Sequence, residues 1–133
     1  MLNKKINNYF LLLYSLLPIS IIAGSLISFI NILLIDISFL ILVYFNKEYS
    51  FLKNESLKYF LILYIYLIFN SLISIDQTLG LNRNLGFLRI IILFVAINYF
   101  FKDKNFFRKV FLIWLITISI VILDVFFENY FGK

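Results

Sequence analysis

The sequence predicts an all-α, polytopic membrane protein: a transmembrane helical bundle with about five membrane helices. Of its 133 residues, 63% are hydrophobic and only 14% are charged, and the mean hydropathy is +1.00. A soluble domain of this size has too little interior for so much apolar surface. One proline, four glycines and 20% aromatic residues are typical of continuous helices with aromatic ends, and not of a loop-rich or barrel fold.

The first apolar region runs from Tyr9 to Phe45, and Asp36 is its only charged residue. As a single helix it would be about 55 Å long, whereas a hydrocarbon core of about 30 Å needs about 20 residues. We therefore predict two spans, at about 9–23 and 32–45, with a turn or interfacial stretch around Gly24 to Asn31. A cleaved signal peptide ending near Ala23 is the alternative, but a small-x-small cleavage pattern is missing and another span follows.

Three further spans are predicted at about 59–75, 85–101 and 106–127, with a polar loop at 76–84. Charge placement tests this assignment because cytoplasmic loops carry the excess of Lys and Arg. With the N-terminus in the cytoplasm, most of the twelve cations fall inside: Lys4, Lys5, Lys47, Lys53, Lys58, Lys102, Lys104, Arg108 and Lys109. Arg83, Arg89 and Lys133 then lie outside. Fusing the first two spans would reverse most of these positions, so five spans fit the rule best.

Missing residue types exclude several kinds of chemistry. The chain has no cysteine, hence no disulfide or thiolate nucleophile, and no histidine, the commonest general base. It contains no nucleotide-binding glycine motif and no cluster of metal ligands, so we expect neither a cofactor nor a metal. The net charge of +5 comes from cations at helix ends, which argues against nucleic acid as a partner. The catalytic residues stay unknown, because this chain shows no self-contained active site.

Two arginines, Arg83 and Arg89, occur in the outer loop and at the start of the fourth span. An ionisable group inside a membrane helix costs about 2.5 to 3.5 kcal/mol on insertion scales, so Arg89 needs a compensating anion or carboxylate. A guanidinium group can grip a phosphate or carboxylate at two points. Asp76, Asp124 and Glu128 share the predicted outer side. We therefore predict an anion site at Arg83 and Arg89, supported by Asp76 and Asp124.

Alternatives remain open for each of these residues. Arg89 could instead pair with Asp124 on the next helix while Arg83 extends to the lipid headgroups, or Asp124 could orient an arginine that also binds the ligand. Asp36 could serve as a proton or cation relay. If its span begins near Ile32, however, Asp36 is about one turn from the outer interface, which favours a satisfied or interfacial acid.

Short motifs recur in a recognisable order along the chain. Leu17-Pro18-Ile19-Ser20 and Gly24 come first, and Ser74-Ile75-Asp76 then leads to Gly80-Leu81-x-Arg83 and Leu88-Arg89. Ala96 and Tyr99-Phe100 follow, and the chain closes with the segment from Asp124 to Lys133. This order resembles the N-terminal part of the O-antigen ligase and O-antigen polymerase family of bacterial inner-membrane proteins. In the closing motif, Glu128 stands where that family usually has Gln.

The resemblance implies metal-independent transfer of a glycan from an undecaprenyl-diphosphate carrier, at the periplasmic face, to lipid A core or to a growing polysaccharide. It implies diphosphate binding by Arg83 and Arg89 and leaves ligase and polymerase as open choices. Family members have further helices and a large periplasmic loop, so we expect an N-terminal fragment that is inactive alone, with the catalytic base outside it. The competing hypothesis is a non-enzymatic small multi-pass membrane protein or transporter subunit, in which Arg89, Asp124 and Asp36 form a polar track between helices.

Overall fold

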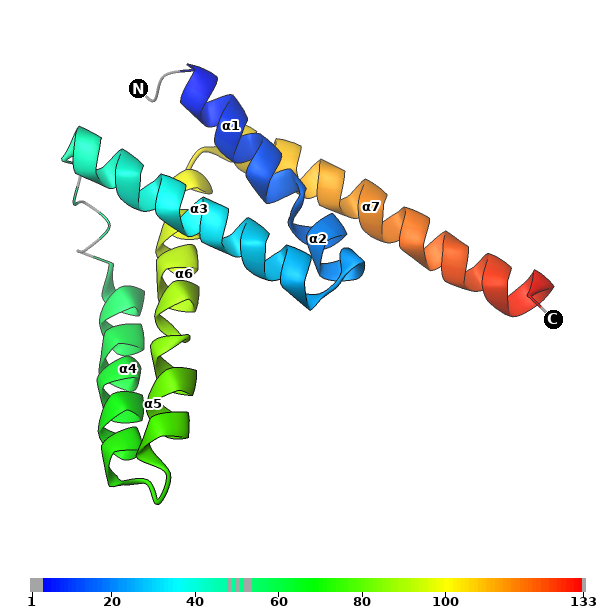
Figure 1. The fold of residues 1–133 in the computed structure, drawn as a ribbon. Coiled ribbons are helices and arrows are strands. Elements are labelled where there is room, and N and C mark those ends of the chain that lie inside the picture. The colour runs from blue at the N-terminus through cyan, green and yellow to red at the C-terminus, as the bar shows by residue number, and fades with distance from the viewer. Residues whose placement is uncertain (1–3, 48, 50, 52–53, 133) are drawn as a thin grey trace. The chain divides into compact units, whose positions relative to one another are not determined.

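A computed structural model of the chain describes residues 4–47, 49, 51 and 54–132, and none of these residues forms a strand. The helices in chain order are α1 (Lys4–Ser15), α2 (Leu17–Ala23), α3 (Ser25–Asn46), α4 (Glu55–Ile73), α5 (Gln77–Leu85), α6 (Leu88–Phe100) and α7 (Lys104–Phe131) (Figure 1). Five segments of this described chain are long and apolar enough to cross a membrane: Lys4–Ala23, Ser25–Asn46, Glu55–Ile73, Gln77–Phe100 and Lys104–Phe131. The predicted all-α fold class with about five membrane helices is confirmed. Lys53 and Lys133, used in the topology prediction, lie outside the described residues.

Gly24 alone separates the first two membrane segments. Its φ of 123° is a conformation that residues with a Cβ rarely adopt, so glycine suits this turn. Helix α3 begins at the next residue, and the predicted interfacial stretch as far as Asn31 is therefore wrong. The polar side chains that suggested a break are satisfied within helices: Ser28 Oγ donates to the Ser25 carbonyl at 2.9 Å. Asn31 Nδ2 donates to Ser20 Oγ at 3.2 Å.

The contacts divide the chain into two compact units. Unit 1 comprises Met1–Ile35 and Phe100–Lys133, and unit 2 comprises Asp36–Tyr99. In unit 1, α1 and α2 both pack against α7. Rings from α1, from the end of α6 and from α7 form its aromatic core: Phe10 lies 4.2 Å from Phe100, and Tyr14 meets Phe106 edge to face at 5.8 Å, measured between ring centroids. All four side chains are almost fully buried.

Pro18 explains a second feature of unit 1, the interruption between α1 and α2. Proline lacks the N–H that would bond to the carbonyl four residues earlier, which is that of Tyr14. The indole Nε1 of Trp114, on α7, donates to this carbonyl at 2.7 Å. Asn31 Nδ2 also reaches the adjacent Leu13 carbonyl at 3.4 Å. The interrupted helix is thus held by donors from α3 and α7.

Unit 2 contains a hairpin of α4 and α5, which lie side by side (Figure 1). A Cβ placed on Gly80 would lie only 3.3 Å from Ser71 Cβ, so glycine permits this close approach. Asn84 Nδ2 donates to the Leu67 carbonyl at 2.9 Å and also to Ser71 Oγ. The predicted polar loop at 76–84 is therefore wrong, since most of it is helix α5 packed on α4.

Aromatic pairs place α6 against its neighbours in unit 2. Phe94 on α6 lies 4.6 Å from Phe60 on α4, and Tyr99 lies 5.7 Å from Phe39 on α3, between ring centroids. Helix α6 therefore contacts the half of α3 that carries Asp36. These aromatic contacts hold α6 against both α3 and α4 within unit 2.

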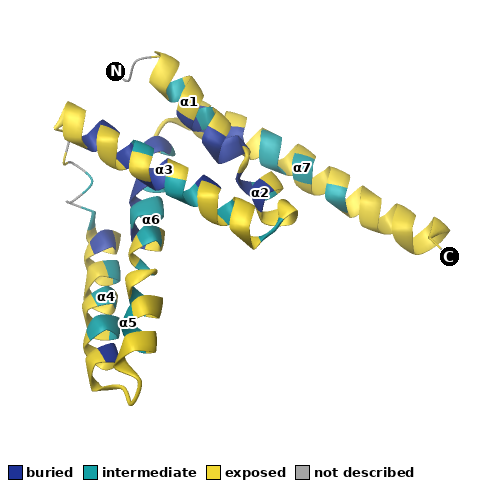
Figure 2. Cartoon of the chain, viewed as in Figure 1, coloured by how far each residue is buried: buried dark blue, intermediate teal, exposed yellow. Residues whose placement is uncertain are grey.

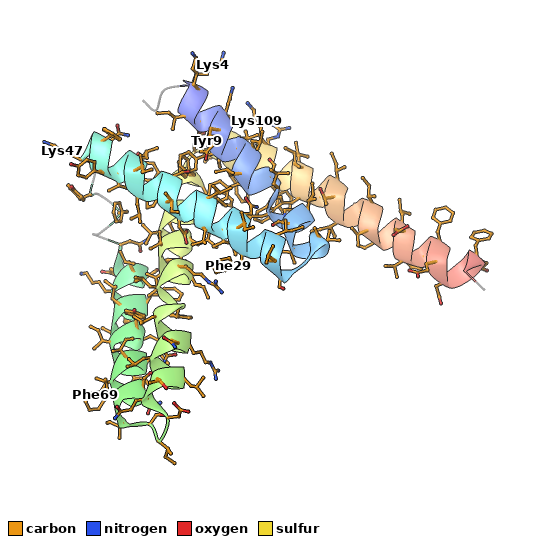
Figure 3. The ribbon with its side chains drawn as sticks, in the orientation of Figure 1. Lys4, Tyr9, Phe29, Lys47, Phe69 and Lys109 are labelled. Carbon is orange, nitrogen blue, oxygen red and sulfur yellow. The ribbon has the colours of Figure 1, made fainter. Side chains whose placement is uncertain are left out.

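Large apolar side chains remain exposed over much of α4 and α7 (Figure 2). Phe69, for example, is 61% exposed and points away from α5 (Figure 3). Helix α7 extends past both predicted bounds of its span, from Lys104 to Phe131, and its C-terminal half is exposed. Such surfaces are stable in contact with lipid, where apolar side chains need no shielding from water.

Candidate functional site

The candidate site lies where the segment Gln77–Phe100 is interrupted. Helix α5 ends at Leu85, two turn residues follow, and α6 begins at Leu88. The Phe87 N–H donates to the Asn84 carbonyl at 3.0 Å, a tight turn in place of regular helical bonding. Within a membrane, irregular backbone is tolerated where it is buried in protein or lines a polar cavity, and broken helices commonly form ion and substrate sites. The break is therefore a place where charged groups can be held.

The two sequence-predicted arginines flank this break. Arg83 lies in the last turn of α5 and is exposed, whereas Arg89 lies in the first turn of α6 and is half-buried. The arrangement brings two arginine side chains to a single interrupted segment.

Asp76 is the N-cap of α5. Its carboxylate accepts a hydrogen bond from the Leu79 backbone N–H at 3.2 Å and from Thr78 Oγ1 at 2.9 Å. The Leu79 N–H, and next the Thr78 hydroxyl, hold the pKa of Asp76 below its usual value of 3.8. Asp76 therefore caps the helix whose last turn carries Arg83.

This cap gives a pH prediction. Because the folded pKa of Asp76 is lowered, its carboxylate stabilises α5 at pH values above its usual pKa, and that stabilisation is lost as the pH falls through the lowered pKa. The effect is small because Asp76 is exposed. Asn also caps helices but does not titrate, so Asp76→Asn should lose less thermal stability between neutral pH and about pH 3 than the wild type does. Equal acid sensitivity of the two proteins, measured by thermal melting in detergent, would contradict this role.

Asp36 occupies a different place from the one predicted. It lies near the middle of α3 and not one turn from its outer end, because α3 begins at Ser25. Its side chain is 3% exposed, and neither carboxylate oxygen has a hydrogen-bond partner among the described residues. The expectation of a satisfied or interfacial acid is therefore wrong.

Asp36 and Arg89 both lie deep in segments that are long and apolar enough to cross a membrane. Counted from the helix ends predicted to be outside, Ser25 and Gln77, both lie about 15 to 20 Å along their segments at about 1.5 Å per residue. The sequence held one signal for the depth of Asp36, its isolation in a long apolar region. Placing the break at Gly24 would have moved Asp36 to mid-helix.

Asp124 and Glu128, the other acids of the predicted outer face, are exposed on α7. They belong to unit 1, whereas Arg83 and Arg89 belong to unit 2.

No family model, curated protein or solved structure matches this chain. Functional interpretation therefore rests on the geometry around the α5–α6 break and on the sequence motifs. The chain is a multi-pass membrane protein by the length and composition of its helices.

Proposed function

We propose that this chain belongs to a glycan transferase of the O-antigen ligase or polymerase type in a bacterial inner membrane. Its substrate is a glycan carried on undecaprenyl diphosphate, and its acceptor is lipid A core or a growing polysaccharide. The observation that carries the proposal is the pair of arginines on either side of the α5–α6 break. In this proposal membrane lipids contact the apolar helix faces, and the glycan is transferred at the periplasmic face.

A lipid diphosphate matches the chemistry of this pair. In the proposed reaction an acceptor hydroxyl attacks the anomeric carbon of the glycan, the bond to the diphosphate breaks, and the hydroxyl proton passes to a base that we do not assign to this chain. Negative charge develops on the departing diphosphate oxygens. Fixed cations that stabilise such charge lower the barrier, and guanidinium groups bind phosphate oxygens at two points. Arg83 and Arg89 take this role.

The motif order supports the same proposal. The segment from Ser74 to Arg89, which resembles the arginine-bearing loop of the O-antigen ligase family, coincides with the cap of α5, helix α5, the break and the first turn of α6. The motif residues are therefore structural parts of one interrupted segment. Both the resemblance and the position of the charges point to this segment.

A non-enzymatic membrane protein or transporter subunit is the second candidate function. The observation that favours it is the buried Asp36, since ionisable residues inside membrane segments are typical of ion and substrate pathways. In that case Arg89 would serve a path between helices, and Arg83 would be dispensable. The two functions therefore differ in what they require of Arg83.

The proposed function predicts that Arg83→Ala and Arg89→Ala each weaken binding of undecaprenyl diphosphate to the purified chain. Loss of one charge-assisted bidentate contact costs about 1.5 to 3 kcal/mol, which corresponds to a decrease in affinity of about tenfold or more. Native mass spectrometry with the lipid in detergent measures this change. Arg83→Lys and Arg89→Lys should fall between wild type and alanine, because lysine keeps the charge without the planar fork.

Arg108→Ala provides the matched control. Arg108 is an exposed arginine in the first turns of α7, at the end predicted to be cytoplasmic. Its removal should leave binding unchanged. If both alanine variants at the break bind the lipid as well as the Arg108 variant does, the diphosphate role is wrong. In cells, the double change Arg83→Ala with Arg89→Ala should abolish lipopolysaccharide banding.

A further inference from the structure

Helix α5 carries a polar surface within a segment that is long enough to cross a membrane. Five of its nine residues are polar: Gln77, Thr78, Asn82, Arg83 and Asn84. Asn84 faces α4, where its amide donates to the Leu67 carbonyl. Asn82 and Arg83 are exposed. The proposed reaction uses Arg83 but gives no reason for the polar surface around it.

Two contacts fix the register of α5 against α4. A Cβ placed on Gly80 would lie 3.3 Å from Ser71 Cβ. Four residues later on α5, Asn84 Nδ2 donates at 2.9 Å to the carbonyl of Leu67, which is four residues earlier on α4. The two helices are therefore antiparallel, and the positions midway between these contacts are level with one another.

Asn82 and Phe69 are the residues at these midway positions. Phe69 lies four residues before Ile73, the last residue of α4, so its level is about 6 Å inside the helix end at about 1.5 Å per residue. Helix α4 has 19 residues and is about 28 Å long, close to the thickness of about 30 Å of a hydrocarbon core. Asn82 is therefore level with the hydrocarbon layer.

The two sides of the α4–α5 pair differ in polarity at this level. Phe69 is 61% exposed and points away from α5 (Figure 3). Ile62, Ile65 and Ile73, at helical spacing on the same side of α4, are also exposed, as suits contact with lipid. On α5, however, the exposed amide of Asn82 would lose its hydrogen bonds with water if lipid covered it. Its side chain is also too short to extend to the headgroups, as an arginine side chain can.

We propose that α5 faces water on the outer side of the membrane, at a depth where α4 faces lipid. Water then supplies the hydrogen bonds of Asn82 and surrounds the guanidinium group of Arg83, so that hydrated anions reach this arginine without passing through lipid. The irregular backbone between α5 and α6 fits the same surroundings, because non-helical backbone at membrane depth is tolerated where it meets water or protein. Such a hydrated face suits a transferase and a transporter subunit alike, since either brings a hydrated ligand to this side.

Cysteine labelling tests the proposal, because the natural chain has no cysteine. The full chain carrying Asn82→Cys or Phe69→Cys is reconstituted in lipid nanodiscs, where both membrane faces are open to solution, and is treated with a sulfonated maleimide. Asn82→Cys should react about as fast as Ile75→Cys, a thiol at a fully exposed position in the connection between α4 and α5. Phe69→Cys is the control at matched depth. It should react on the order of a hundredfold more slowly, because the charged reagent and the thiolate are both disfavoured in hydrocarbon.

The labelling rates decide the proposal without any measurement of lipid binding. Fast reaction of Asn82→Cys with slow reaction of Phe69→Cys supports a hydrated α5. Slow reaction of Asn82→Cys overturns it, since lipid or another protein surface then covers α5. Fast reaction of both overturns it as well, because the end of the α4–α5 hairpin then lies outside the bilayer. If Asn82→Cys folds poorly, Arg83→Cys repeats the measurement at the adjacent exposed position, and its thiol should react equally fast.

Discussion

Replacing Trp114 by Phe should destabilise the chain by about 1 to 2 kcal/mol, and adding Pro18→Ala should remove most of that cost. The Tyr14 carbonyl has no N–H partner four residues later, because residue 18 is proline. Trp114 Nε1 supplies the missing donor at 2.7 Å. With Ala at position 18 the backbone can satisfy this carbonyl by itself, so the indole becomes dispensable. Thermal melting of the four proteins in one detergent gives the coupling between the two residues.

The matched control for this cycle is Leu115→Phe. Leu115 follows Trp114 on α7 and is 49% exposed, so a ring there meets no buried carbonyl. Its effect should be small and independent of Pro18. If Trp114→Phe costs the same with proline and with alanine at position 18, the indole does not compensate the proline, and its value lies in packing alone.

A disulfide should form almost completely in the variant Ser71→Cys with Gly80→Cys. The Cβ of residue 80 would lie 3.3 Å from that of residue 71, close to the spacing of about 3.5 to 4.5 Å that disulfides require. The natural chain has no cysteine, so every thiol in this variant is an introduced one. After mild oxidation, a maleimide-polymer reagent should add to neither position on a denaturing gel. Reduction should restore two additions.

Phe69→Cys with Gly80→Cys is the control pair for this cross-link. Phe69 is 61% exposed and points away from α5, although it is only two residues from Ser71 in sequence (Figure 3). Both of its thiols should stay reactive after oxidation. Equal cross-linking of the two pairs would mean that α4 and α5 do not hold one register. Residues 77–85 would then behave as part of the polar loop that the sequence predicted.

The candidate site was only partly predictable from the sequence. Arg83 and Arg89 could be identified because cations are unexpected on the outer side of a membrane protein, and the structure places both beside the α5–α6 break. The helical state of residues 77–85 was missed, since their polar composition resembles that of a loop. What stabilises them is tertiary: the side chain of Asn84 bonds to α4, and Gly80 permits close contact with Ser71.

The depth of Asp36 along its helix was also not predictable from the sequence. Its isolation in an apolar region was visible, but its depth depended on where the first break lies. Polar residues between Gly24 and Asn31 suggested a long interfacial stretch. In the structure Gly24 alone makes the turn. Ser28 and Asn31 lie within α3, because their side chains form hydrogen bonds with groups in nearby helical turns. That shift moves Asp36 from a predicted helix end to the middle of α3.

The sequence by itself determined the fold class, the number of membrane segments and the residues that carry unusual charge. The composition and the positions of Lys and Arg between the apolar segments are enough to predict these features. Both reflect the requirements of the lipid bilayer and not the packing of particular helices. Only the tertiary structure decided that α5 is a helix, that donors from α3 and α7 stabilise the interruption at Pro18, and that Asp36 is buried in the middle of α3. Each of these depends on contacts between residues far apart in the chain, and local pattern carries no information about such contacts.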